Sequence, residues 1–176
     1  VTETEMLRNI QLMKEINCFA PDVIHLHNIH YALGPLIVRS IRKKNYPLVM
    51  TLHNFRLICP SATLFYNNNI HRESIFEKFP WQAVKSKALD NSFLKSLITA
   101  FTYWFHNKIG TWNMISYYFT LSAFAKNILI ESQIDISNNK FIVKPNFCNV
   151  ATESINKKVF EDYFIYVGRL SAEKGV

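Results

Sequence analysis

Cysteine is scarce in this sequence of 176 residues, and its few cysteines are too widely spaced to act together. Three are present, Cys18, Cys59 and Cys148, and none belongs to a CxxC pair. Disulfide-stapled domains carry a higher density of cysteines, and structural zinc sites need closely spaced ligands. The sequence therefore favours free thiols in a reducing compartment and indicates neither a disulfide nor a zinc site.

Long apolar runs are also missing. The longest near-continuous one, residues 97–105, falls far short of the ~20 residues that a membrane-spanning helix needs. Residues 1–15 carry charges throughout, unlike a signal peptide, and the chain has no internal repeat or low-complexity tract. We therefore expect a soluble cytoplasmic protein, for which peripheral contact at the inner face of a membrane stays open.

Apolar and positively charged side chains are plentiful by comparison. Hydrophobic residues make up 49% of the chain and charged residues 19%, as in globular proteins. The formal net charge of +7 favours anionic partners such as phosphates, nucleotides or acidic lipids. The alternative is a basic surface that binds no ligand. The length suits one ordinary domain with room for an incomplete second one.

Apolar spacing alternates between helical and extended patterns. The predicted helices are 6–16, 33–44, 81–89, 93–108 and 123–131, the last capped by Ser122, and the predicted strands are 23–27, 48–52, 117–121 and 141–144. Asparagines 67–69 mark a turn. Successive strand–helix–strand units predict an α/β fold with a Rossmann-like parallel sheet and crossover helices.

The C-terminal segment combines an apolar run, a glycine and two cations. Residues 164–167 predict a buried strand that ends at Gly168, and Arg169 and Lys174 follow. Glycine allows close backbone approach and a helix N-terminus favours anions, so this turn suits a diphosphate. A solvated turn is the plainer interpretation. Because the sequence stops at Val176, where the next helix should begin, we expect a piece of a longer protein.

Four local patterns stand in a fixed order along the chain. They are PDVIHLH at 21–27, TLHN at 51–54, VKPN at 143–146 and GRLSAEKG at 168–175. Together they resemble the family-4 glycosyltransferases, retaining enzymes of the GT-B fold, and HNFRLICP at 53–60 is similar to a branch that builds bacterial surface polysaccharides. The resemblance covers nearly the whole chain. It implies two Rossmann-like domains, the first for the acceptor and the second for the nucleotide sugar.

The resemblance also implies how this chain is divided. Residues 1–148 would be the acceptor-side Rossmann-like domain without its first strand, 149–161 the interdomain linker, and 162–176 the first strand and phosphate loop of a truncated nucleotide-sugar-binding domain. The family's glycine-rich loop and E-x7-E pair have no counterpart, so we expect this piece alone to be inactive. The parent enzyme would move a sugar from a nucleotide diphosphate sugar to a glycan or lipid-linked acceptor in polysaccharide biosynthesis, without a metal or cofactor.

Four site residues follow from the resemblance. Family cations at the positions of Arg169 and Lys174 neutralise the donor diphosphate, and Gly168 would allow the backbone to approach it. His53 ends a predicted strand and matches a family histidine near the transferred sugar. An imidazole there can hydrogen-bond a sugar hydroxyl or steady charge in the transition state, although a structural histidine is the alternative.

Other polar residues carry weaker assignments. His25, His27 and His30 form H-x-H-x-x-H, with His25 and His27 on the same side of their strand. No carboxylate or cysteine lies nearby at ligand spacing, so we favour a crevice-lining or packing role for His27 and Asn28 over a metal site. Asn146 matches a family asparagine, but a turn residue is an equal interpretation.

The segment 76–112 mixes aromatic residues with lysines. Its aromatics include Trp81, Phe101, Trp104, Phe105 and Trp112. This mixture suits the interface of an anionic membrane, where a lipid-linked acceptor would lie. We favour a helical insert with a core face, and the two interpretations are compatible.

Two rival functions remain open. A non-catalytic basic α/β module could bind an anionic polymer, although the sequence lacks the patterns of nucleic-acid readers, so we expect no nucleic acid. A sugar-nucleotide epimerase of the GT-B fold would need carboxylates in its cleft, and Asp22 and Asp90 are not obviously placed for that.

Overall fold

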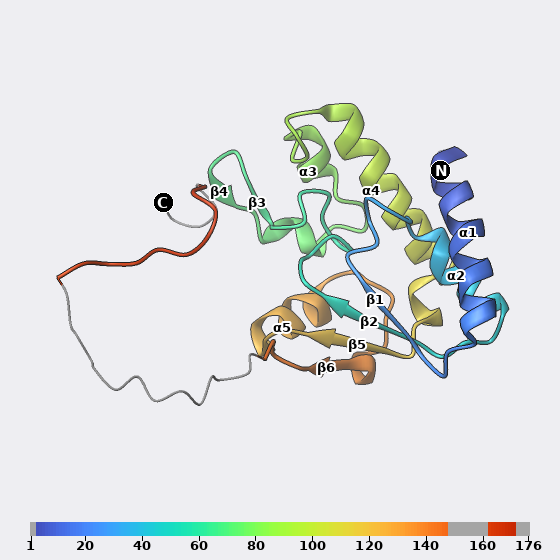
Figure 1. Ribbon diagram of the computed structural model, residues 1–176. Helices are drawn as coiled ribbons and strands as arrows, with labels where there is room; N and C mark the ends of the chain where they lie inside the picture. The colour runs from blue at the N-terminus through green and yellow to red at the C-terminus, as the bar shows by residue number, and fades with distance from the viewer. Residues whose placement is uncertain (1–2, 148–161, 172–176) are drawn as a thin grey trace. The chain divides into compact units, whose positions relative to one another are not determined.

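The computed structural model describes residues 3–147 and 162–171, and the chain divides into two compact units between Pro145 and Asn146. The larger unit is a four-stranded parallel sheet with helices packed against it (Figure 1). The expected α/β, Rossmann-like fold class is therefore confirmed. No helix among the described residues is long and apolar enough to cross a bilayer.

The sheet runs in chain order from one edge to the other. Its strands are β1 (Ile24–His27), β2 (Leu48–Leu52), β5 (Tyr117–Thr120) and β6 (Phe141–Val143). The parallel register places Leu26, Met50, Tyr118 and Phe141 in one row, and each is buried. Because all four strands point the same way, their carboxyl ends meet at one edge of the sheet.

Five α-helices accompany the strands in the described residues. They are α1 (Glu3–Phe19), α2 (Leu36–Lys43), α3 (Trp81–Lys85), α4 (Phe93–Lys108) and α5 (Ala123–Glu131). The hydroxyl of Ser122 accepts a hydrogen bond of 3.2 Å from the backbone N–H of Ala125, which confirms the predicted cap of α5. Helix α2 begins later than predicted because Gly34 lies at φ 65° and Pro35 is its N-cap.

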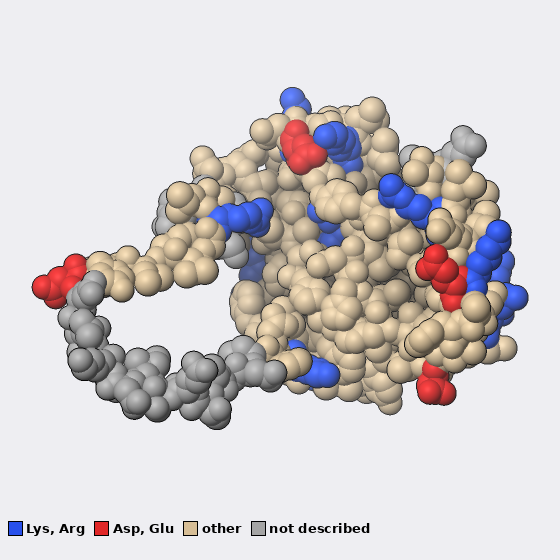
Figure 2. All heavy atoms as spheres, viewed as in Figure 1, with Lys and Arg blue, Asp and Glu red and all other residues tan. Residues whose placement is uncertain are grey.

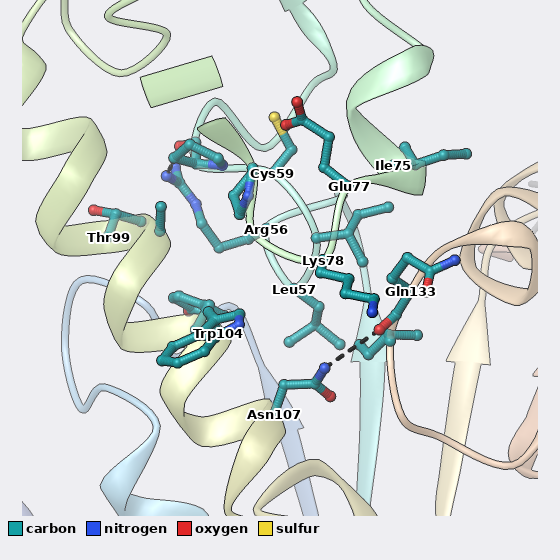
Figure 3. Close-up of a pocket in the computed structure, with 16 residues that line it drawn as sticks. Arg56, Leu57, Cys59, Ile75, Glu77, Lys78, Thr99, Trp104, Asn107 and Gln133 are labelled. Atoms are coloured by element: carbon teal, nitrogen blue, oxygen red, sulfur yellow. Dashed lines mark hydrogen bonds between the residues drawn. The ribbon is translucent and has the colours of Figure 1, made fainter. Parts of the chain in front are cut away.

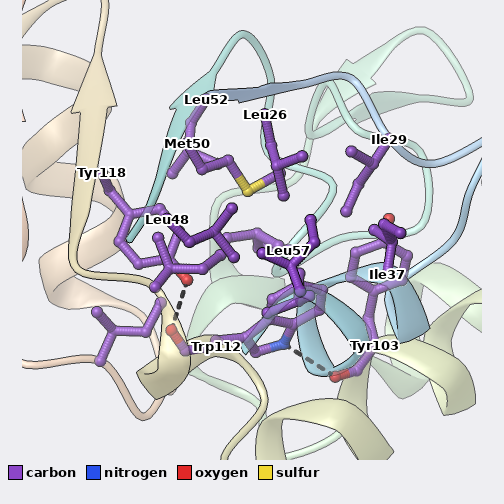
Figure 4. Packing of buried hydrophobic residues seen from close by; sticks show 14 of the residues in the cluster. Leu26, Ile29, Ile37, Leu48, Met50, Leu52, Leu57, Tyr103, Trp112 and Tyr118 are labelled. Atoms are coloured by element: carbon purple, nitrogen blue, oxygen red, sulfur yellow. Dashed lines mark hydrogen bonds between the residues drawn. The ribbon is translucent and has the colours of Figure 1, made fainter. Parts of the chain in front are cut away.

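The main core lies between α2 and the sheet (Figure 4). Ile37 of α2 packs with the buried row of the sheet and with Trp112, and both are fully buried. The Tyr118 hydroxyl donates to the Trp112 carbonyl oxygen over 2.7 Å, and Trp112 Nε1 donates to the Tyr103 carbonyl oxygen. The core-face interpretation of segment 76–112 therefore holds for Trp112.

The opposite face of the sheet is less completely covered. Tyr117 is 49% exposed and Ile142 is 41% exposed on that face, which also carries His25 and His27. Buried parallel sheets usually have both faces covered. The histidines of β1 therefore lie on a face that other molecules or segments can reach.

The loop region after β2 contains a small hairpin that was not predicted. Strands β3 (Phe65–Tyr66) and β4 (Asn69–Ile70) pair in antiparallel fashion around Asn67 and Asn68. These two asparagines have φ angles of 50° and 58°, as a two-residue primed turn requires. The predicted turn is confirmed, while the flanking strands are too short to show a period-2 pattern. Three 3-10 helices complete the elements of the described residues: Glu73–Phe76, Trp112–Met114 and Asn138–Lys140.

The smaller unit is described over residues 146–147 and 162–171, and these residues form no strand. The described residues therefore show no strand over 164–167, unlike the sequence prediction, and Phe164 and Val167 are exposed there. Within this segment the Tyr166 hydroxyl donates to the Arg169 carbonyl oxygen over 2.8 Å. The predicted linker 149–161 and Lys174 lie outside the described residues.

Candidate functional site

The carboxyl ends of β1 and β2 bring three histidines together. His27 ends β1 and His53 follows β2, and His27 Nδ1 lies 2.9 Å from His53 Nε2. The His25 ring lies beside that of His27 in a tilted arrangement, with 4.1 Å between ring centroids, and His25 Nε2 lies 2.7 Å from Thr51 Oγ1. The sequence prediction that His25 and His27 share one side of the strand is confirmed.

His27 opposes the protonation of both His25 and His53 in this cluster. Partial burial lowers the pKa of His53, and His27 lowers it further. Burial also lowers the pKa of His25, with added contributions from His27, Lys144 and His53. Neutral imidazole has one donor and one acceptor nitrogen, so these side chains can take part in hydrogen bonds of either sense with a hydroxyl.

A pocket of about 310 Å³ opens beside His53. Three segments that are distant in the sequence form its polar wall: Asn28, His30 and Tyr31 after β1, His53, Asn54 and Arg56 after β2, and Tyr103 of α4. Its floor is apolar and includes Met50, Leu52 and Leu57. No aspartate or glutamate is among the described residues that line it.

Side-chain contacts connect the three segments that form the polar wall of this pocket. His30 Nδ1 lies 3.0 Å from the Tyr103 hydroxyl, which joins the β1 loop to α4. Arg56 lies over the Tyr31 ring, 5.7 Å from its centroid, and donates through Nη2 to the Tyr31 hydroxyl and through Nη1 to the Pro60 carbonyl oxygen. The pocket is therefore held open by its own lining residues.

A second hollow, shown in Figure 3, shares Arg56 with the first among its lining residues. Its lining includes Lys78, Trp104 and Asn107, whose Nδ2 donates to the Gln133 carbonyl oxygen over 3.4 Å. The free space is about 40 Å³, enough for only about one or two waters. The free space of this hollow is far smaller than that of the pocket beside His53.

The remaining predicted residues are placed as follows. His30 turns away from His25 and His27 toward Tyr103, and among the described residues no group of His, Cys, Asp or Glu is arranged to hold a metal ion. Asn146 is exposed. Gly168 and Arg169 are exposed in the smaller unit. A diphosphate site at Gly168, Arg169 and Lys174 therefore stays a prediction.

Three lining residues were not expected from the sequence. Tyr31 and Arg56 each follow a strand end by a few positions, a signal that could have pointed to them because ligands bind at that edge of open α/β sheets. Tyr103 carries no such signal, since it sits within a helix far along the chain and reaches the pocket only through the fold.

The chain is similar to one family of known proteins. The family model described as starch synthase catalytic domain matches residues 5–106, which is more than half of the chain. This stretch includes β1 and β2 with their histidines and most of α4. No curated protein and no solved structure matches the chain. The expected glycosyltransferase of the GT-B fold is thus confirmed at the level of the broad class. The chain belongs to the starch synthase catalytic domain family of GT-B glycosyltransferases.

Proposed function

We propose that the larger unit holds the acceptor while a sugar is transferred from a nucleotide diphosphate sugar, with retention at the anomeric carbon. The acceptor is a growing glycan or a lipid-linked sugar in polysaccharide biosynthesis, as in the family-4 enzymes that the sequence resembles. The observation that carries this proposal is the position of His53 at the carboxyl edge of the sheet, beside a sugar-sized pocket rich in hydrogen-bonding groups.

His53 is the residue that we assign to the reacting sugar. Its Nε2 contacts His27, so its Nδ1 is the nitrogen available for a substrate hydroxyl. The lowered pKa keeps the ring neutral near pH 7, which suits hydrogen bonding without adding a full charge. This assignment makes His53 a substrate contact and His27 its support.

The donor diphosphate is assigned to Arg169 and Lys174, with Gly168 allowing close approach of the backbone. Negative charge grows on the leaving diphosphate as the sugar departs, and fixed cations stabilise it without a metal. Arg169 offers a planar fork of donors, and its side chain is exposed in the described segment. The support for this assignment is the sequence pattern.

The outer face of α4 is assigned to peripheral contact with an anionic membrane. Leu94, Ile98, Phe101 and Phe105 form one stripe at helical spacing, and each is at least 44% exposed. Exposed lysines precede α4 in the sequence at positions 78, 85 and 87, and Lys and Arg side chains outnumber acidic ones on the face shown in Figure 2. Such a surface would bring the site to lipid-linked acceptors.

The test is a transfer assay on the full-length protein with a panel of nucleotide diphosphate sugars and a glycan or lipid-linked acceptor. We expect consumption of one donor with retained anomeric configuration, read by NMR, and a loss of about 100-fold or more in kcat for His53→Ala. His71→Ala is the matched control, because His71 stacks on Tyr66 in the hairpin and does not line the pocket. If no donor in the panel is bound or consumed, the proposal fails.

A further inference from the structure

We propose that the pocket beside His53 binds a sugar that carries a phosphate group, and that Arg56 is the cation that receives this phosphate. The inference rests on the proposed function and names the chemical class of its acceptor. It follows from the charge, the hydrogen-bonding groups and the size of the pocket.

The charge of the pocket is positive and uncompensated by a carboxylate. The two ion pairs among the described residues join Arg72 to Glu131 and Lys95 to Asp90, so neither involves Arg56. Glu77 lines the neighbouring hollow and not this pocket, and its Oε2 accepts a hydrogen bond of 3.0 Å from the Gln82 backbone N–H. Within the part of the chain that the structure describes, the guanidinium of Arg56 therefore has only neutral hydrogen-bond partners.

Arg56 is held in place before any ligand arrives. The Pro60 carbonyl oxygen and the Tyr31 hydroxyl each accept from a different nitrogen of its fork, and the Tyr31 ring lies beneath it. A guanidinium has five N–H donors, so two such contacts leave others for a phosphate oxygen. Because the side chain is already ordered, binding costs little of the entropy that a free arginine would lose.

The rest of the lining suits a sugar ring. The backbone N–H of Arg56 donates to Asn54 Oδ1 over 3.0 Å, which orients the Asn54 amide so that its Nδ2 stays available for a hydroxyl. His53 supplies a neutral imidazole, and Leu52 and Leu57 supply an apolar floor. A volume of about 310 Å³ lies at the low end of the ~300–1,000 Å³ seen for ligand pockets, so it holds about one sugar unit with its phosphate.

The test compares two probes on the wild-type chain without any donor present. We expect glucose 1-phosphate to bind at least tenfold more tightly than glucose by isothermal titration calorimetry, with the difference shrinking as salt is raised. Arg56→Gln should abolish this difference and Arg56→Lys should keep part of it, because lysine retains the charge without the fork. Arg72→Gln is the control, since Arg72 is exposed and remote from the lining.

The proposal would be overturned by equal binding of the two probes, by no binding of either, or by an equal loss of the difference in Arg72→Gln. Binding of uridine diphosphate to the same pocket as tightly as glucose 1-phosphate would overturn it too. The phosphate site at Arg56 would then bind the donor nucleotide and not the acceptor. Thermal melting of Arg56→Gln shows whether that variant is folded. The comparison of glucose 1-phosphate with glucose on the wild-type chain does not depend on this variant.

A further arm identifies the source of the phosphate. The short-alkyl diester of glucose 1-phosphate mimics a lipid-linked sugar, and tighter binding of the diester points to a lipid carrier, whereas tighter binding of the monoester points to a soluble sugar phosphate. Both results support the proposal. Because no donor is used, the proposed transfer can fail in its own assay while this binding stands, and the reverse also holds.

Discussion

His27 and His53 face each other nitrogen to nitrogen, with 2.9 Å between Nδ1 and Nε2. Only one of these two nitrogens can carry a hydrogen in the contact, so the tautomer of one ring fixes that of the other. If His27 donates, the Nδ1 of His53 carries the hydrogen and donates to substrate; if His53 donates, its Nδ1 accepts. The neighbouring strand therefore sets the hydrogen-bonding sense of the proposed substrate contact.

Replacing His27 by alanine should raise the pKa of His53. Burial lowers that pKa and His27 lowers it further, so only the second contribution is removed. An NMR titration of the His53 ring in wild type and in His27→Ala measures the change. His71→Ala should leave the His53 titration where it is, and an unchanged pKa in His27→Ala would rule out the coupling.

Stability should fall as pH drops from about 6.5 toward 4, because of His106. This side chain is 4% exposed, lies 2.9 Å through Nδ1 from the Thr111 hydroxyl, and has its pKa lowered to about 4 by burial and by the nearby Arg39. A folded-state pKa below the unfolded value means that the neutral ring stabilises the fold above pH 6.5, and that this contribution is lost as pH falls through the folded pKa. The loss amounts to roughly 3 kcal/mol.

Urea unfolding of wild type and His106→Gln across that pH range measures this contribution. The glutamine variant does not titrate, so its unfolding free energy should depend less on pH even if it is lower throughout. Parallel pH profiles for the two proteins would show that other groups cause the acid sensitivity.

Trp112→Ala should cost about 3–5 kcal/mol of unfolding free energy, because the fully buried ring fills the space between Tyr103 and the sheet. Trp81→Ala is the matched control: Trp81 is 51% exposed, and its loss should change stability by about 0.5 kcal/mol or less. Chemical denaturation followed by circular dichroism measures both. Similar losses for the two variants would contradict the packing described for the core.

Phe101→Ser combined with Phe105→Ser should weaken binding to phosphatidylglycerol vesicles by about tenfold or more, because two exposed rings of the α4 stripe no longer enter the interface. Cosedimentation measures the binding, with phosphatidylcholine vesicles as the uncharged comparison. Phe164→Ser, at an exposed phenylalanine outside α4, is the control for general hydrophobicity. Equal binding of wild type and the double variant would refute the membrane assignment.

Elements with a strong local signal could be predicted from the sequence. The bounds of β2, α4 and α5 match the prediction, because apolar periodicity and caps such as Ser122 act within a few residues. The helix predicted over 81–89 ends at Lys85, since Lys87 adopts a positive φ. The strand predicted over 164–167 is not formed in the described residues. A strand needs a neighbouring strand for its backbone hydrogen bonds, and a local apolar pattern does not supply one.

The candidate site was only partly predictable. His53, at the end of a predicted strand, could be placed at the edge of the sheet before the structure was known. The pocket wall that contains Arg56, Tyr31 and Tyr103 arises from segments that meet only after folding. His30 lies apart from His25 and His27, because the chain turns after β1 and brings His30 to Tyr103 of α4.

The order of the sheet also has a consequence for how the chain folds. Strands β1 and β2 are joined by one short helix, and so are β5 and β6, so each pair can form from nearby residues. Pairing β2 with β5 instead requires the long segment 53–116 to close into a loop. This closure costs conformational entropy before the pairing buries any apolar surface. We therefore expect the two halves of the sheet to form early and their joining, at the β2–β5 seam, to limit the folding rate.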